Sequence, residues 1–169
     1  MSNKITNQLL DEIANLVAER IGLHFPADRR RDLERGLSAA ASEFEFDNVE
    51  SCLHWLSSSP LTKIQIEILA SHLTVGETYF FREKKSLEIM EQSVLPDLIK
   101  SRRDGRRLRI WSAGCCTGEE PYTIAIMLAG MIPDPERGDV TLLATDIDPR
   151  FLSKASAGVC SDWSFSSPC

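Results

Sequence analysis

The chain contains 169 residues, of which 43% are hydrophobic and 26% are charged, a composition typical of a globular protein with one domain of ordinary size or two small ones. Its 25 acidic residues outnumber its 19 basic residues, and the formal net charge of −6 argues against a broad surface for binding nucleic acid. No apolar run is long enough to span a membrane and the N-terminus lacks the pattern of a signal peptide, so we expect a cytoplasmic protein without membrane insertion.

The first 90 residues have the hydrophobic spacing of helices, because apolar residues recur every three or four positions. The first helix can end at Gly22, and the third follows the capping signal Asp47-x-x-Glu50. The pattern predicts helices over residues 5–21, about 28–42, from Asp47 to the break at Ser57, and about 61–73. Helices this short are stable only when they pack on each other, so we expect a small helical bundle over residues 1–90.

A further helix is predicted over residues 84–100, and it connects the bundle to a basic segment, Lys100–Arg107. Charged clusters beside a turn are usually solvated, so we expect this segment to be an exposed loop. The helical N-terminal domain is therefore predicted over residues 1–90, with the connection reaching about residue 105.

The hydrophobic pattern changes after residue 106. Residues 108–113 and 139–148 are predicted to be buried strands, with a helix over residues 119–131 between them, which makes a βαβ unit with parallel strands and a right-handed crossover. A parallel sheet needs several strands and helices on both faces. The sequence after Asp148 offers only a short helix over residues 151–157 and an end that we expect to be unstructured. The predicted fold class is therefore α/β, with a small helical bundle followed by the first βαβ portion of an incomplete Rossmann-like domain.

The loop between the first strand and the following helix has the sequence GCCTGEE. A phosphate-binding P-loop needs four residues between its glycines and then Lys-Ser/Thr, whereas three residues separate Gly114 from Gly118 and Glu119 takes the place of the lysine. A dinucleotide loop needs a middle glycine where this chain has Cys116, and it would bring pyrophosphate to two carboxylates. Both phosphate-containing ligands are therefore disfavoured.

A cofactor that has a cationic end and no phosphate fits the loop better. S-adenosylmethionine carries a sulfonium, an ammonium and a carboxylate, and Glu119 or Glu120 could lie beside its positive charge while Gly114 and Gly118 let the backbone approach. Asp146, at the carboxyl end of the second strand, could accept hydrogen bonds from the ribose hydroxyls. The alternative is that the two acids only favour the helix dipole, by a few tenths of a kcal/mol.

The cysteines and histidines do not predict a metal site. None of the five cysteines forms a C-x-x-C pair, and no histidine stands at ligand spacing near them. A disulfide framework does not fit a cytosolic chain either. We therefore expect small buried or half-buried thiols and no metal.

Three blocks of the sequence, Thr74–Glu83, Arg109–Ile126 and Ala144–Gly158, together resemble the CheR-type chemotaxis receptor methyltransferases in their order and approximate spacing. The helical region before Thr74 resembles the small N-terminal domain of that family. The resemblance implies that residues 106–169 are the start of an S-adenosylmethionine-binding methyltransferase domain that is truncated here. It also implies an enzyme that converts glutamate side chains of chemoreceptors to methyl esters and releases S-adenosylhomocysteine.

The resemblance also implies roles for individual residues. It assigns cofactor contacts to Thr78, Arg82, Glu120 and Asp146, and Arg82 is the expected catalytic residue because it could hold the carboxylate of the cofactor or of the substrate. A glutamate side chain, with a pKa of about 4.3, is already an anion at neutral pH, so the reaction needs no general base.

The partners that the resemblance implies are the cytoplasmic helices of chemoreceptors. The residues expected to contact them lie on the second helix and are basic: Arg29, Arg30, Arg31 and Arg35. The sequence departs from the family at Gly36, where an arginine is expected, and at Gly76, where some members have asparagine. Two alternatives stay open: a methyltransferase of the same fold with another acceptor, and a non-catalytic module that binds a partner helix.

Overall fold

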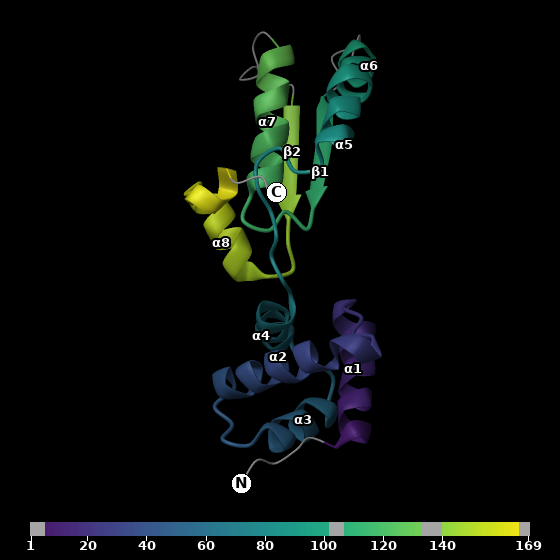
Figure 1. Ribbon diagram of the computed structural model, residues 1–169, viewed down its shortest axis with the longest axis vertical. Helices are drawn as coiled ribbons and strands as arrows, with labels where there is room; N and C mark the ends of the chain where they lie inside the picture. Colours follow the sequence, from purple (N-terminus) through teal and green to yellow (C-terminus); the bar gives the residue numbers. More distant parts are fainter. Residues whose placement is uncertain (1–5, 102–106, 133–139, 166–169) are drawn as a thin grey trace. The chain divides into compact units, whose positions relative to one another are not determined.

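The computed structural model describes residues 6–101, 107–132 and 140–165. The chain divides into two compact units, residues 1–75 and 76–169 (Figure 1). Each unit has its own hydrophobic core. In the described part of the chain, no helix combines the length and the apolar character that a membrane span requires.

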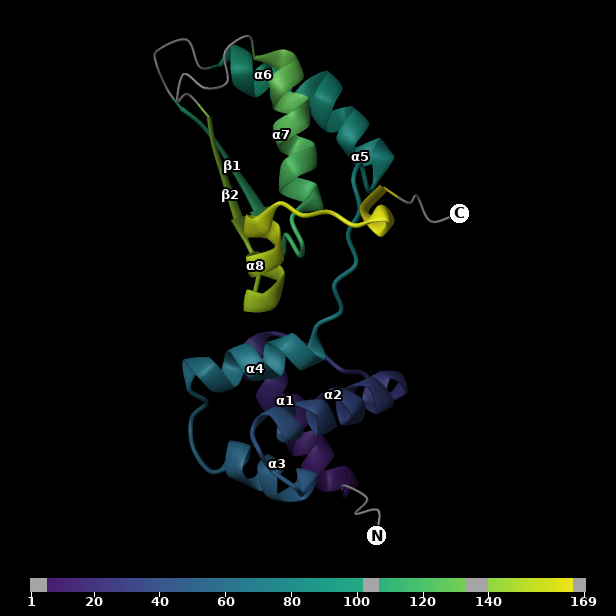
Figure 2. The same cartoon turned by 90° about the vertical axis from the view of Figure 1, so that its left-hand side faces the viewer.

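The first unit is a bundle of helices, as the sequence predicted (Figures 1 and 2). Its elements are α1 (Asn7–Ile21), the short 3₁₀ helix η1 (Ala27–Arg29), α2 (Arg30–Glu43), α3 (Val49–Ser57) and α4 (Lys63–Leu73). Leucine and isoleucine side chains from α1 to α4 fill the core, among them Leu10, Leu33, Leu53 and Leu69, each at most 1% exposed. Burial of these side chains, each contributing about 1.5–3 kcal/mol, stabilises helices that are too short to be stable alone.

Capping residues define where these helices begin and end. Gly22 ends α1 in the left-handed conformation, with φ of 78°, as the sequence predicted. The predicted cap of α3 was wrong by one residue, because Asn48 and not Asp47 accepts a hydrogen bond, from the backbone N–H of Ser51. The capping box of α4, Thr62 with Gln65, was not predicted.

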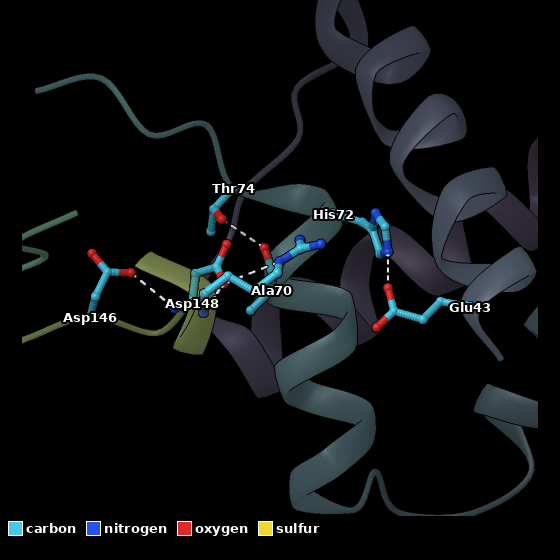
Figure 3. A network of polar contacts seen from close by, with 7 residues as sticks. Glu43, Ala70, His72, Thr74, Asp146 and Asp148 are labelled. Atoms are coloured by element: carbon cyan, nitrogen blue, oxygen red, sulfur yellow. Dashed lines mark hydrogen bonds and ion pairs between the residues drawn. The ribbon is translucent and has the colours of Figure 1, made fainter. Parts of the chain in front are cut away.

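One polar contact and one glycine define how α4 packs against α2, and a second polar contact lies at the end of α4 itself. The His72 Nε2 atom lies 2.5 Å from Glu43 Oε2, between α4 and α2, and the Thr74 hydroxyl donates to the Ala70 carbonyl at the end of α4 (Figure 3). A Cβ atom on Gly36 would lie 2.7 Å from the His72 carbonyl oxygen and 2.7 Å from Leu73 Cδ2. The absence of a side chain at position 36 therefore allows α2 and α4 to approach closely.

The second unit contains a parallel pair of strands, β1 (Leu108–Ala113) and β2 (Val140–Thr145), connected through α7 (Glu119–Met131). Leu108 pairs with Val140 at one end and Ala113 with Thr145 at the other. The predicted α/β fold class, a helical bundle followed by a βαβ unit, is confirmed. The remaining elements are α5 (Lys84–Ile89), the π-helical turn η2 (Met90–Val94), α6 (Leu95–Lys100), α8 (Pro149–Ala157) and the 3₁₀ helix η4 (Asp162–Phe165).

One face of the two strands packs against helices. Alternate strand residues, such as Ile110 and Leu142, join a core with Ile124 and Leu128 of α7, which lies beside the sheet (Figure 2). The side chains between them point the other way, and Trp111 and Leu143 are 67% and 55% exposed. The loop after β1 and the start of α8 both lie at the carboxyl end of the sheet, where ligands of open α/β folds bind.

Two predictions for this unit need correction. The predicted helix over residues 84–100 has the expected extent but contains the π-helical turn η2. The end of the chain, predicted to be unstructured, forms η4 over Asp162–Phe165, and its Ser164 is only 2% exposed. Most of the predicted basic loop, residues 102–106, lies outside the described residues.

The compact units and the predicted domains are different divisions of the chain. Side chains of α5, η2 and α6 pack with β1 and α7 in the core of the second unit. The predicted bounds, residues 1–90 with a connection to about residue 105 and residues 106–169, stay a prediction, because packing within a unit does not define a functional domain.

Candidate functional site

The loop Gly114–Gly118 wraps around the carboxyl ends of both strands. The backbone N–H groups of Gly114 and Cys115 both donate to the Thr145 carbonyl, at 2.8 and 2.9 Å. Gly114 and Gly118 have φ angles of 73° and 102°, and even Cys116 has a φ angle of 49°. Such positive angles favour glycine, so the two glycines of the loop are required by its backbone conformation.

A cleft of about 490 Å³ opens beside this loop. Its walls come from residues 77–83, α5 and η2, β1, the loop and the first turns of α7. It brings together four of the predicted site residues, Thr78, Arg82, Gly114 and Glu120. The volume lies in the range of sites for small molecules and cofactors.

Asp146 does not line the cleft but holds the loop that does. Its Oδ2 atom accepts a hydrogen bond from the Cys116 backbone N–H at 2.8 Å. Its Oδ1 atom accepts one from the Asp148 N–H at 2.9 Å, the contact drawn in Figure 3. A carboxylate has about four lone-pair positions, so these bonds leave capacity for a ligand hydroxyl.

Gly118 also lies away from the lining of the cleft. A Cβ atom at this position would meet Ala155 Cβ at 3.0 Å and Tyr122 Cε2 at 3.2 Å. Gly118 therefore permits close packing between the start of α7 and α8. This contact explains the second glycine of the loop without a ligand.

The two adjacent acids of the loop have different environments. Glu120 is exposed in the cleft, and the buried Ser112 hydroxyl donates to its Oε1 atom at 2.6 Å. Glu119 is only 4% exposed, and its two carboxylate oxygens accept hydrogen bonds from the Thr117 and Ser164 hydroxyls at 2.6 and 2.7 Å. Of the two acids, Glu120 is therefore the one that faces the cleft.

Arg82 is held by a nearby acidic residue. Its guanidinium donates to the Glu77 carbonyl at 2.5 Å and lies 3.5 Å from the Glu77 carboxylate. The side chain remains 43% exposed, so a ligand carboxylate can compete with Glu77 for the guanidinium. Arginine suits this role because its planar group can bind two oxygens at once.

Gly76 is packed against the back of the loop. A Cβ atom there would lie 2.4 Å from Phe151 Cζ and 2.6 Å from Cys116 Sγ. A side chain at position 76 would therefore require Phe151 or Cys116 to move. Glycine at this position thus allows close packing against Phe151 and Cys116.

The surroundings of the two loop cysteines favour the neutral thiol. Burial raises the pKa of Cys115 and of Cys116, and the Asp146 carboxylate raises the pKa of each thiol further. A protonated thiol is a poor nucleophile and a poor metal ligand. Among the described residues, no group of three or more histidine, cysteine or acidic side chains is placed to hold a metal ion.

Several residues that contact the site were not predicted from the sequence. Ser112 could have been found, because it is a polar residue at an inward position of a strand whose other inward residues are apolar. Thr123 and Ser164 gave no such signal. Their contacts, to Phe81 and Glu119, join parts of the chain more than forty positions apart.

The predicted receptor-binding arginines lie in the first unit and are mostly paired. Arg29 and Arg35 both contact Asp32, at 3.1 and 3.0 Å. Arg30 pairs with Asp11 of α1, and Arg31 is exposed. These ion pairs lower the net positive charge of the helix face.

The sequence of this chain is similar to those of known chemotaxis methyltransferases. Residues 76–167, more than half of the chain, match the family model described as "CheR methyltransferase, SAM binding domain". The chain is 43% identical over 103 residues to a probable chemotaxis protein methyltransferase of Rhizobium etli, covering 61% of this chain and 38% of that protein. It is 33% identical over 158 residues to the chemotaxis protein methyltransferase of Borreliella burgdorferi, covering 92% of this chain and 56% of that protein.

A further relative, chemotaxis protein methyltransferase 2 of Vibrio cholerae, is 42% identical over 97 residues, or 57% of this chain and 33% of that protein. The chain thus spans between one third and somewhat more than half of the length of these relatives.

Proposed function

The chain belongs to the CheR methyltransferase family, and from this we propose that the whole protein transfers a methyl group from S-adenosylmethionine to glutamate side chains of chemoreceptors. The products are glutamyl methyl esters and S-adenosylhomocysteine. The observation that carries this proposal is the cleft at the carboxyl end of the sheet, with Glu120 oriented into it by Ser112.

The residues of the cleft fit the chemical groups of the cofactor. Glu120 supplies a negative charge for its ammonium or sulfonium, and Gly114 lets the backbone approach closely. Arg82 supplies a positive charge for a carboxylate, and Thr78 adds a hydroxyl group. An acid at the start of a helix repels phosphate, so this set favours a cationic ligand without phosphates.

Asp146 and Gly118 belong to the proposed site in a different way. Asp146 shapes the loop through the Cys116 amide and can also accept the ribose hydroxyls. Gly118 keeps the start of α7 close to α8 and so fixes the position of the loop.

The reaction depends on alignment of the glutamate with the methyl group more than on general acid–base catalysis. The bound cofactor supplies an electrophilic methyl group on its sulfonium. The attacking glutamate, with a pKa of about 4.3, is an anion at neutral pH and needs no base. Arg82 and Glu120 then act by holding the reactants in line and by replacing water around their charges. We propose Arg82 as the catalytic residue in this sense.

We further propose that the substrate is recognised through the first unit. Exposed Arg31, together with Arg29, Arg30 and Arg35, can attract the acidic helices of a receptor. Transfer of labelled methyl groups to a receptor fragment, compared with other acceptors, tests this. Equal labelling of unrelated acceptors would favour a methyltransferase of the same fold with another substrate.

Calorimetric titration with S-adenosylhomocysteine tests the site. Arg82→Ala, Glu120→Ala and Asp146→Ala are each expected to weaken binding by roughly 10- to 100-fold, since a hydrogen bond to a charged group contributes about 1.5–3 kcal/mol. Arg109→Ala, on the exposed face of β1, is the matched control. Unchanged affinity in Arg82→Ala and Asp146→Ala would overturn the assignment. Parallel titration of a chain extended to the length of the relatives shows whether residues outside this chain complete the site.

A further inference from the structure

Glu119 forms a buried connection between the cofactor loop and the end of the described chain. Its carboxylate accepts hydrogen bonds from Thr117 Oγ1 at 2.6 Å, within the loop, and from Ser164 Oγ at 2.7 Å, in η4. Glu119 and Ser164 are 4% and 2% exposed. A carboxylate with two hydroxyl donors in a buried site holds both of them firmly, because losing either bond leaves a buried polar group unsatisfied.

The connection continues from Ser164 to the wall of the cleft. The Ser164 carbonyl accepts a hydrogen bond from the Phe80 backbone N–H at 2.8 Å. The rings of Phe80 and Phe165 also stack, with their centroids 5.1 Å apart. The position of residue 80 therefore depends on the docking of η4, and η4 is docked through Glu119.

A second path runs through the backbone of Glu119. Its carbonyl accepts a hydrogen bond from Thr123 Oγ1 at 2.7 Å, which orients that hydroxyl within α7. The same oxygen of Thr123 accepts a bond from the Phe81 N–H at 3.2 Å. The amides of two successive residues, Phe80 and Phe81, are thus held by partners that Glu119 positions.

The segment that these bonds hold carries the cofactor residues. Phe80 and Phe81 lie between Thr78 and Arg82, both of which line the cleft. Phe81 has a φ angle of 57°, in the left-handed region that a phenylalanine rarely adopts. Tertiary contacts are needed to keep this backbone conformation, and the hydrogen bonds donated by the two backbone N–H groups supply them.

We propose that Glu119 is a positioning residue for the cofactor cleft. Its carboxylate docks η4 through Ser164, and η4 together with Thr123 holds residues 80 and 81 so that Thr78 and Arg82 form the wall of the cleft. The two adjacent acids then have separate tasks, because Glu120 faces the ligand and Glu119 fixes the wall. The effect on ligand affinity rests on the proposed function, whereas the effect on the segment does not.

Amide hydrogen exchange, measured by NMR on the full chain, tests the connection without any ligand. Glu119→Ala and Ser164→Ala are expected to accelerate exchange of the Phe80 amide by roughly tenfold or more, because local opening at η4 becomes easier. The Phe81 amide should change less, since both variants keep Thr123 and the Glu119 carbonyl that orients it. Amides in the middle of α7 keep their protection. Ser153→Ala, on the exposed face of α8, is the matched control and leaves Phe80 and Phe81 unchanged.

A conservative variant separates positioning from general loss of structure. Glutamine at position 119 keeps one acceptor oxygen, and the hydroxyl that loses its acceptor can turn to accept from the new amide group. Glu119→Gln is therefore expected to fall between wild type and Glu119→Ala in the exchange of Phe80. If Glu119→Ala does not fold, Ser164→Ala and Glu119→Gln carry the comparison.

Titration of the same variants with S-adenosylhomocysteine completes the test. Ser164→Ala and Glu119→Ala are expected to bind it at least about fivefold more weakly, the effect of roughly one lost hydrogen bond. Unchanged exchange at Phe80 in folded Ser164→Ala protein would overturn the proposal, as would faster exchange with unchanged affinity. Absence of binding both by this chain and by the chain extended to the length of the relatives would contradict the proposed function, while the exchange data would still decide whether Glu119 holds the segment.

Discussion

Successive residues of an α-helix point in directions about 100° apart, and this geometry separates Glu119 from Glu120 at the start of α7. Glu119 points into the protein, where two hydroxyl groups satisfy its carboxylate. Glu120 points into the cleft, where only Ser112 among the described residues donates to its carboxylate. A single acidic dipeptide can therefore supply one structural and one ligand-facing carboxylate.

Cys52 is the residue for which stability should depend most clearly on pH. It is fully buried in α3, and burial raises the pKa of its thiol from 9.0 to about 11. Because the folded-state pKa is the higher one, its contribution to stability is complete below pH 9 and is lost as the pH rises towards 11. At pH 10.5 we expect a loss of at most about 2 kcal/mol in the free energy of unfolding of the first unit.

Urea unfolding at pH 8 and pH 10.5, followed through NMR signals of α3, measures this loss. Other groups titrate in the same range, so the comparison is with Cys52→Ala, which lacks the thiol. The variant is less stable at both pH values because of the cavity, but it should lose less stability on going to pH 10.5. An equal loss in both proteins would show that Cys52 does not cause it.

The sequence predicted the residues of the cleft better than the contacts that orient them. Gly114 was predicted from loop chemistry, and Thr78, Arg82 and Glu120 from the resemblance to the family; all four line one cleft. Loop chemistry alone could not choose between Glu119 and Glu120, because the choice depends on Ser164, a residue 45 positions further along the chain. Short-range patterns carry no information about such partners.

At the scale of elements, the helical glycines show how packing can reverse a local preference. Gly normally weakens a helix interior by up to about 1 kcal/mol relative to Ala. Gly36 in α2 nevertheless has no room for a Cβ atom, which would lie 2.7 Å from the His72 carbonyl oxygen. Among the described residues outside its own helical turn, no atom lies within 4 Å of such a Cβ position on Gly130 in α7.

The same substitution should therefore have opposite effects at these two positions. Gly36→Ala is expected to destabilise the first unit by about 1–3 kcal/mol, the usual cost of overpacking. Gly130→Ala is expected to stabilise the second unit by roughly 0.5–1 kcal/mol. Urea denaturation followed by circular dichroism and NMR measures both. A stabilised Gly36→Ala protein would show that α2 and α4 can separate at little cost.

The π-helical turn in the predicted helix over residues 84–100 has a cause in the hydrophobic pattern. In an uninterrupted α-helix, Met90 and Val94 would point to the same side. In the structure Val94 is 46% exposed and Leu95 is 2% exposed. The Leu95 N–H donates to the Met90 carbonyl, five residues back, and this extra residue brings Leu95 into the core.

Elements with strong local signals were predicted closely, and those that depend on distant partners were not. The predicted bounds of β1 and α7 agree with the structure, because a short apolar strand, a glycine turn and a helix follow one another directly. The 3₁₀ helix η4 was missed, since its stability comes from Ser164 and the stacking of Phe165 on Phe80. Nothing in the local sequence of η4 predicts either contact.

At the scale of the whole chain, the two compact units have different relations to the proposed function. The family model matches residues 76–167, which lie within the second unit, and the residues that line the cleft lie there too. The first unit carries the arginines proposed for receptor binding. Cofactor binding and substrate recognition are thus assigned to separate units.

This separation predicts that a change in the core of the first unit leaves cofactor affinity unaltered. Gly36→Ala should lower the stability of residues 1–75 and bind S-adenosylhomocysteine as wild type does. At a ligand concentration of 100 times the Kd, the second unit should gain about 2.7 kcal/mol of stability in both proteins. Residue-specific amide exchange with and without the ligand measures the two units separately. Weaker binding by folded Gly36→Ala protein would mean that the first unit also shapes the cofactor site, which would contradict the assignment of one task to each unit.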